Sequence, residues 1–170
     1  MSDVSVRRFQ EAEWPLYRAL RLRALRDSPD AFATTYANAL SRTEAEWRDR
    51  LAGMSGEHDL ALVAELHGNP AGLVWVRIDP STPDTADLYQ MWIAPELRGQ
   101  GAGRTLLESA IAWTAARGAR SMRLGVTIGN SPAQRLYEGA GFCAVGPPEP
   151  LRADSDLKVQ HMLLALPARD

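Results

Sequence analysis

Three glycines within five residues, between a strand pattern and a helical pattern, constrain the fold of this chain more than any other feature. Residues 87–93 are rich in aromatic and aliphatic side chains, which is typical of a strand. Pro95 ends that strand because it has no N–H to give to a ladder. Gly99, Gly101 and Gly103 follow, and from Leu106 apolar residues recur at helical spacing. The glycines are therefore expected at the turn between a strand and the N-terminus of a helix.

A turn of this kind is suited to an anion such as phosphate. Unpaired N–H groups and the positive end of the helix dipole point into one small space. Glycine lets the backbone approach the anion without an intervening side chain. Arg98 and Arg104 flank the loop and add positive charge. We therefore expect a phosphate-bearing ligand here.

Two common phosphate-binding loops do not match this segment. A Walker A loop needs glycine where this chain has Arg98, and it needs a lysine that is absent here. The dinucleotide fingerprint needs Gly-x-Gly-x-x-Gly, whereas the spacing here is Gly-x-Gly-x-Gly. No acidic residue ends a strand about twenty residues later, as that fingerprint requires. The glycines must therefore serve a different loop, or be a plain glycine-rich turn.

Two motifs in order identify a family that this chain resembles. The first is Arg98-Gly-Gln-Gly-Ala-Gly103, which fits the pattern Arg/Gln-x-x-Gly-x-Gly/Ala. The second, at residues 130–142, fits Asn-x-x-Ala-x-x-Leu-Tyr-x-x-x-Gly-Phe. Together they resemble the acetyl-CoA loop and the following motif of the GNAT superfamily of N-acetyltransferases. The likeness is close over residues 87–146 and, before that, extends only to the order of the elements.

The expected order of elements agrees with this resemblance. Patterning predicts a strand, two helices, three strands, and then alternating helices and strands that end with residues 158–165. The resemblance implies one domain over residues 1–170, an α/β fold of the GNAT-like three-layer α/β/α type. Its central sheet is expected to be mixed and mostly antiparallel, with about seven strands. In that family the central strand and the next one splay apart, and the pantetheine arm of the cofactor enters the gap.

The resemblance also implies a set of residues that bind acetyl-CoA. The main chain of Met91 and Ile93 is expected to pair with pantetheine, and Asn130 is expected to hydrogen-bond the cofactor or simply to fill a turn. The diphosphate is assigned to the loop and its flanks: Arg98, Gly99, Gln100, Gly101, Ala102, Gly103 and Arg104.

Tyr137 and Asp87 are the candidate catalytic residues. A phenol with pKa of about 10 can protonate a thiolate whose thiol has pKa of about 8.5, so Tyr137 is the expected general acid. The alternative for Tyr137 is an aromatic of the core. Asp87 opens the central strand where some family members place a glutamate base, and the alternative is that it only caps the strand. Even spacing predicts that Asp87, Tyr89 and Met91 share one face of that strand.

The acceptor implied by the resemblance is an amine. We expect a primary amine of a small molecule, attacked directly in a ternary complex, with Phe32, Tyr36, Tyr89 and the loop around Leu151 and Arg152 forming its site. A protein N-terminus or lysine is the alternative acceptor. A non-catalytic CoA-binding module and a nucleotide-binding protein are the alternatives of another class.

Composition excludes several other classes. A formal net charge of −2 gives no indication of binding to nucleic acid or to an anionic membrane surface. The single Cys143 predicts no internal disulfide and is typical of a reducing cytoplasm. The three histidines of the chain are scattered, so no metal is expected. No apolar run reaches the length of a membrane span. The sequence is compatible with a homodimer.

Overall fold

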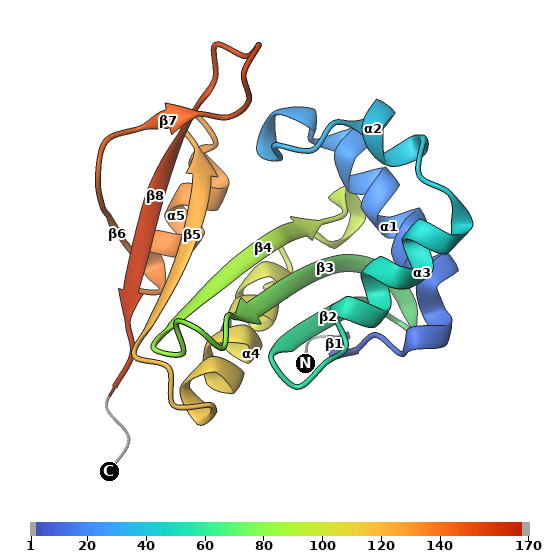
Figure 1. Ribbon diagram of the computed structural model, residues 1–170, viewed down its shortest axis with the longest axis horizontal. Helices are drawn as coiled ribbons and strands as arrows, with labels where there is room; N and C mark the ends of the chain where they lie inside the picture. The colour runs from blue at the N-terminus through green and yellow to red at the C-terminus, as the bar shows by residue number, and fades with distance from the viewer. Residues whose placement is uncertain (1–2, 168–170) are drawn as a thin grey trace.

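The computed structural model describes residues 3–167. Its strands form an eight-stranded mixed sheet (Figure 1). The strands are β1 Val4–Arg8, β2 Asp59–Leu66, β3 Asn69–Ile78, β4 Thr85–Ile93, β5 Ser121–Thr127, β6 Cys143–Ala144, β7 Glu149–Pro150 and β8 Lys158–Ala165. Their order is β1-β2-β3-β4-β5-β8-β6, and β7 also pairs with β8. Only β4 and β5 run parallel; every other pair is antiparallel.

Helices cover both faces of the sheet. They are α1 Trp14–Asp27, α2 Tyr36–Leu40, α3 Glu44–Gly53, α4 Ala102–Ala116 and α5 Ser131–Gly139, with short 3-10 turns η1 Glu11–Glu13, η2 Pro29–Ala31 and η3 Pro95–Leu97. In Figure 1, α1 to α3 lie on one side of the sheet, and α4 and α5 lie on the other. This confirms the three-layer α/β/α fold. The sheet has eight strands instead of about seven because the proline-rich loop after β6 contains the two-residue strand β7.

Local sequence signals set most helix boundaries. At the start of α3, the Thr43 hydroxyl accepts a hydrogen bond from the Glu46 N–H at 3.2 Å and so acts as the N-cap. Gly118, with φ of +85°, follows α4 as predicted. The helix α5 begins at Ser131, and Pro132 lies in its first turn. Asn130 is the N-cap because its backbone is the last non-helical one, with φ −84° and ψ 74°.

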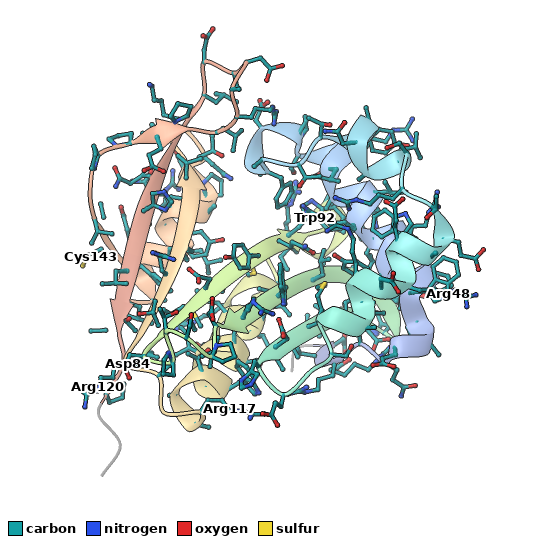
Figure 2. All side chains as sticks on the ribbon, viewed as in Figure 1. Arg48, Asp84, Trp92, Arg117, Arg120 and Cys143 are labelled. Carbon is teal, nitrogen blue, oxygen red and sulfur yellow. The ribbon has the colours of Figure 1, made fainter. Side chains whose placement is uncertain are left out.

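Aromatic side chains fix α1 and α3 against the central strands. Tyr17 and Trp47 are fully buried and meet edge to face with ring centroids 5.9 Å apart. Trp92, on the inner side of β4, donates its indole N–H to Asp27 at 3.1 Å (Figure 2). The C-terminal end of α1 is thereby held over the end of β4, next to the splay between β4 and β5.

A β-bulge at Gln90 changes the direction of the side chains along β4. Gln90 has φ of +59°, and the register with β3 shifts so that Trp75 faces Tyr89 while Leu73 faces Trp92. The Gln90 side chain accepts a hydrogen bond from the buried Tyr17 hydroxyl at 2.7 Å, which stabilises this conformation. The expectation that Met91 shares a face with Asp87 and Tyr89 was therefore wrong, because the extra residue inverts the alternation after Tyr89.

The gap between β4 and β5 is present as the resemblance implied. The two strands pair only from Thr85 to Asp87 with Ser121 to Arg123. Beyond Asp87 they diverge, so their C-terminal halves are separated (Figure 1). Main-chain groups on both edges of the gap are therefore available to a ligand.

Candidate active site

Two cavities lie at the splay. The larger has a volume of about 940 Å³ and extends between β4, β5 and the segment after α1. The smaller, of about 310 Å³, lies between the end of β4 and the start of α5. Four residues line both: Ala31, Phe32, Met91 and Tyr137. The two cavities therefore meet at Met91 and Tyr137, between the glycine loop and the open part of the splay.

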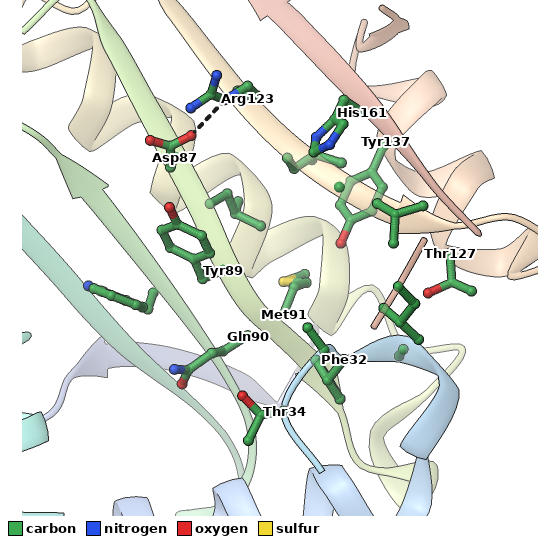
Figure 3. Close-up of a pocket in the computed structure, with 18 of the residues that line it drawn as sticks. Phe32, Thr34, Asp87, Tyr89, Gln90, Met91, Arg123, Thr127, Tyr137 and His161 are labelled. Carbon is green, nitrogen blue, oxygen red and sulfur yellow. Dashed lines mark hydrogen bonds and ion pairs between the residues drawn. The ribbon is translucent and has the colours of Figure 1, made fainter. Parts of the chain in front are cut away.

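Tyr137 projects into the junction from α5. Its side chain is 6% exposed, and its ring packs edge to face on Phe142 with centroids 5.9 Å apart. The hydroxyl points into the larger cavity, toward Met91 (Figure 3). It makes no hydrogen bond to any other residue of 3–167, and burial raises the pKa of Tyr137 above its usual value. The phenol is therefore held protonated with its O–H available to a ligand.

The glycine loop leaves several amides unpaired at the start of α4. Gly99 and Gly101 have φ of +77° and +81°, a conformation that side-chain-bearing residues rarely adopt. Within the described residues, no backbone hydrogen bond is donated by the amides of Gly99, Gln100, Gly101, Ala102, Gly103 or Arg104. A Cβ on Gly103 would lie 3.3 Å from Leu136, so this glycine lets α4 pack closely on α5. The loop thus offers an anion a set of donors at a helix N-terminus.

The two flanking arginines already have partners. Arg98 donates to the Ile93 carbonyl at 3.0 Å and to Asp27 at 2.6 Å, so it ties the loop to β4 and α1. Arg104 is exposed and pairs with Glu108 one turn along α4 at 2.9 Å. The positive charge expected from these side chains is partly neutralised, which leaves the backbone amides as the principal donors.

The structure brings the three predicted pantetheine residues together with Arg98, which was predicted to flank the diphosphate loop. Met91, Ile93, Arg98 and Asn130 all line the smaller cavity. The Asn130 side chain makes no capping bond to α5 and has no hydrogen bond to a residue of 3–167, so its amide is available to a ligand. The lining of this cavity is mostly apolar and includes Arg98, next to the loop of unpaired amides, whereas residues 99–104 themselves line neither cavity. This arrangement fits the elongated, phosphate-bearing shape of coenzyme A.

Asp87 lies farther along the larger cavity and is paired. Its carboxylate accepts a hydrogen bond from Arg123 on β5 at 2.9 Å, and its side chain is 21% exposed (Figure 3). Tyr89 lies next on the same face and stacks on Trp75 with centroids 4.8 Å apart. Burial, and then the negative charge of Asp87, raises the pKa of Tyr89.

The predicted acceptor residues are only partly together. Phe32, Tyr89 and Leu151 line the larger cavity. Tyr36 does not, because it lies on α2 beneath the guanidinium of Arg26. Arg152 joins the late loop to the segment after α1, because it donates hydrogen bonds to the carbonyls of Phe32 and Pro29 at 2.9 and 3.3 Å.

A further hydrogen bond joins β5 to the segment after α1. The Thr127 hydroxyl donates to the Asp30 carbonyl at 2.7 Å. With Arg152, it joins the segment after α1 to the C-terminal half of the chain, so the cavity is bounded on this side.

Arg21, Gln90 and His161 are among the lining residues that were not predicted from the sequence. Arg21 had a signal, because it stands four residues after Tyr17 and four before Leu25 on α1, both of which are fully buried. A charge in an apolar stripe marks an unusual environment. Gln90 and His161 had no such signal; the bulge and the pairing of His161 with Glu149 at 3.0 Å arise only in the fold.

The described residues give no indication of a metal or of membrane insertion. Among residues 3–167 no group of three or more His, Cys, Asp or Glu side chains is placed to hold a metal ion. None of the helices in this part of the chain is long and apolar enough to cross a bilayer.

Comparison with known proteins identifies the family. Residues 10–142 match the model of the acetyltransferase (GNAT) family. Over 146 residues the chain is 30% identical to the mycothiol acetyltransferase of Acidothermus cellulolyticus, which covers 82% of this chain and 45% of that protein. The chain spans less than half the length of the mycothiol acetyltransferases it matches.

Solved structures show the same fold. A GNAT-family acetyltransferase from Streptococcus pneumoniae superposes with a TM-score of 0.84 at 24% identity, covering 96% of this chain and 99% of that one. The structure of yncA, a putative acetyltransferase from Salmonella typhimurium with its cofactor acetyl-CoA, has a TM-score of 0.75 at 21% identity and covers 97% and 95%. The chain therefore belongs to the GNAT family of acetyltransferases, whose acyl donor is acetyl-CoA.

Proposed function

We propose that this protein transfers an acetyl group from acetyl-CoA to a primary amine of a small molecule, by direct attack in a ternary complex. The observation that carries the proposal is the meeting of two cavities at Tyr137 and Met91. One cavity is lined by Arg98, next to the glycine loop, and the other opens between Asp87, Tyr89 and Phe32. A donor and an acceptor bound in the two cavities face each other at the buried phenol.

The donor is held by main-chain groups in this proposal. The amides of residues 99–104 bind the diphosphate, the Asn130 side chain and the edge of β4 at Met91 and Ile93 bind the pantetheine arm, and Arg98 fixes the loop. When bound, acetyl-CoA supplies an acetyl group activated as a thioester. The N–H of Ile93 is the proposed donor to the carbonyl oxygen, at the end of the strand edge that β5 leaves free.

Tyr137 acts on the leaving sulfur. As the amine nitrogen bonds to the carbonyl carbon and the C–S bond breaks, the phenol at Oη donates its proton to the sulfur. Burial keeps this proton on Tyr137 until it is needed. The single cysteine, Cys143, is exposed and lines neither cavity, which supports direct attack over an acyl-cysteine route.

A small acceptor is favoured over a protein terminus or lysine by the walls of the larger cavity. The Thr127 and Arg152 hydrogen bonds close the cavity on the side where the segment after α1 meets β5 and the late loop. A space of about 940 Å³ that is bounded on this side accommodates a compact molecule.

The proposed function is tested by release of CoA with a panel of small primary amines. Wild-type protein, as the full chain, is expected to release thiol only when acetyl-CoA and an acceptor are both present. Acetyl-CoA is expected to raise the thermal midpoint on its own, because a ligand that binds only the folded state stabilises it. A shift with acetyl-CoA but no release on any amine would instead identify a CoA-binding module.

For Asp87 we propose a role as the base that acts through water. One carboxylate oxygen, Oδ1, accepts a hydrogen bond from Arg123 at 2.9 Å, and no hydrogen bond within residues 3–167 is made by the other oxygen. Asp87→Asn is expected to lower kcat/KM about tenfold to 100-fold and to displace the limb of the pH–rate profile on which rate rises with pH. Ser109→Ala, on the outer part of α4, is the control. An unmoved limb in Asp87→Asn shows that this residue is not the base.

A further inference from the structure

Arg21 is a buried cation without a partner. Its side chain is 5% exposed, and its Nη1 atom is buried and has no hydrogen-bond partner. No hydrogen bond or ion pair joins Arg21 to any residue of 3–167; its guanidinium lies over the Phe32 ring, 4.6 Å from the centroid. Burial lowers the pKa of Arg21 to about 10. A buried charge without a counter-ion is costly, so its presence in the fold requires an explanation.

The surroundings of Arg21 increase its positive charge instead of compensating it. Arg50 on α3 lines the same larger cavity, and it too has no ion-pair partner within the described residues. Arg42 is a third cation near enough to interact with both. This side of the cavity, formed by α1, α3 and the segment after α1, therefore carries unpaired positive charge.

On the opposite side of the cavity, each acidic side chain is paired with a basic one. Asp87 is bonded to Arg123, and Glu149 is bonded to His161. The acidic side chains that line the cavity thus have partners of their own, and none of them is bonded to Arg21 or Arg50. The cavity is asymmetric, with an unpaired cationic end.

We propose that the acetyl acceptor carries a carboxylate, which binds to Arg21 and Arg50 while its amine faces Tyr137. The inference rests on the proposed function and specifies its substrate class as amino acids or similar amino carboxylates. Arg21 and Arg50 both line the larger cavity, and the Phe32 ring packs against the Arg21 guanidinium. Trp75 and Tyr89 form an aromatic wall for the remainder of the molecule.

The experiment compares acceptors that differ only in this group. Each α-amino acid of a panel is assayed beside its carboxamide and its decarboxylated amine, with CoA release as the readout. Wild type is expected to favour the carboxylate by at least about tenfold in kcat/KM, because a site built for a charged group leaves its donors unpaired with a neutral analogue. Equal rates on acid and amide, or preference for the polycation spermidine, overturn this inference and leave the proposed function standing. No release with any acceptor overturns both.

Two variants and a control locate the effect. Arg50→Gln and Arg21→Met are expected to abolish the preference, mainly by raising KM for the carboxylate while turnover of the carboxamide is retained. Arg48→Gln removes a cation of the same helix, α3, on its outer side (Figure 2), where Arg48 pairs with Glu44, and the preference should persist.

Thermal stability gives a second readout. Arg21→Met removes a buried uncompensated charge while keeping an unbranched stem, so its midpoint should rise by about 2–4 °C. A fall in the midpoint identifies Arg21 as structural and overturns its role in binding. Arg50 is exposed, so Arg50→Gln folds as wild type does and tests the proposal alone if Arg21→Met fails to fold. An unchanged preference in Arg50→Gln overturns the proposal.

Discussion

Tyr137→Phe is expected to lower kcat about 100-fold or more and to leave acetyl-CoA binding nearly unchanged. The substitution removes one oxygen atom that has no hydrogen-bond partner within residues 3–167, so the fold loses no contact. The ring keeps its packing on Phe142. The variant cannot donate a proton to the leaving sulfur, so kcat falls while binding is retained.

The measurement is steady-state turnover beside a titration of acetyl-CoA followed by thermal shift. Tyr36→Phe removes a phenol oxygen outside both cavities and serves as the matched control, with turnover expected to be that of wild type. Because burial raises the pKa of Tyr137 above the usual value of about 10, wild-type kcat should show no loss from its ionisation below that pH. Turnover that survives in Tyr137→Phe removes the phenol from the mechanism.

The order of elements and the position of the glycine loop could be predicted because each depends on local signals. Hydrophobic patterning predicted β2 and β8, and Pro95 with the glycines that follow it marked the turn before α4. The residues of the smaller cavity could also be placed, since Met91, Ile93, Arg98 and Asn130 all adjoin a recognisable motif. These features follow from short stretches of chain.

Features that depend on contacts across the fold could not be predicted. The bulge at Gln90 requires the Tyr17 hydroxyl, 73 residues earlier in the sequence, and it reversed the expected direction of Met91. Arg98 looks like a phosphate ligand in the sequence, yet it bonds Asp27, which α1 places beside it. Arg21 resembles the other arginines of α1 until burial and the absence of a partner distinguish it. In each case a partner distant in sequence decides what the side chain does.

Gly101→Val is expected to weaken acetyl-CoA binding about 100-fold or more. Gly101 has φ of +81°, and a β-branched residue is strained there, so the chain must rotate and turn the neighbouring amides away from the diphosphate. Losing two charge-assisted hydrogen bonds of about 1.5–3 kcal/mol each is sufficient for this loss of affinity. No side-chain clash contributes, because no atom lies within 4 Å of a Cβ at this position. Titration calorimetry with CoA measures the effect.

The matched control lies at the other end of the same helix. Gly118 follows α4 with φ of +85° and also has no atom within 4 Å of a Cβ, so Gly118→Val imposes the same kind of backbone strain. Backbone strain should lower the free energy of unfolding of each variant by about 1–3 kcal/mol, and the thermal midpoint should fall with it. Only Gly101→Val should lose CoA, because only Gly101 belongs to the set of unpaired amides at the helix N-terminus. If the two variants bind CoA equally well, those amides do not hold the diphosphate, and the donor must occupy a different surface of the fold.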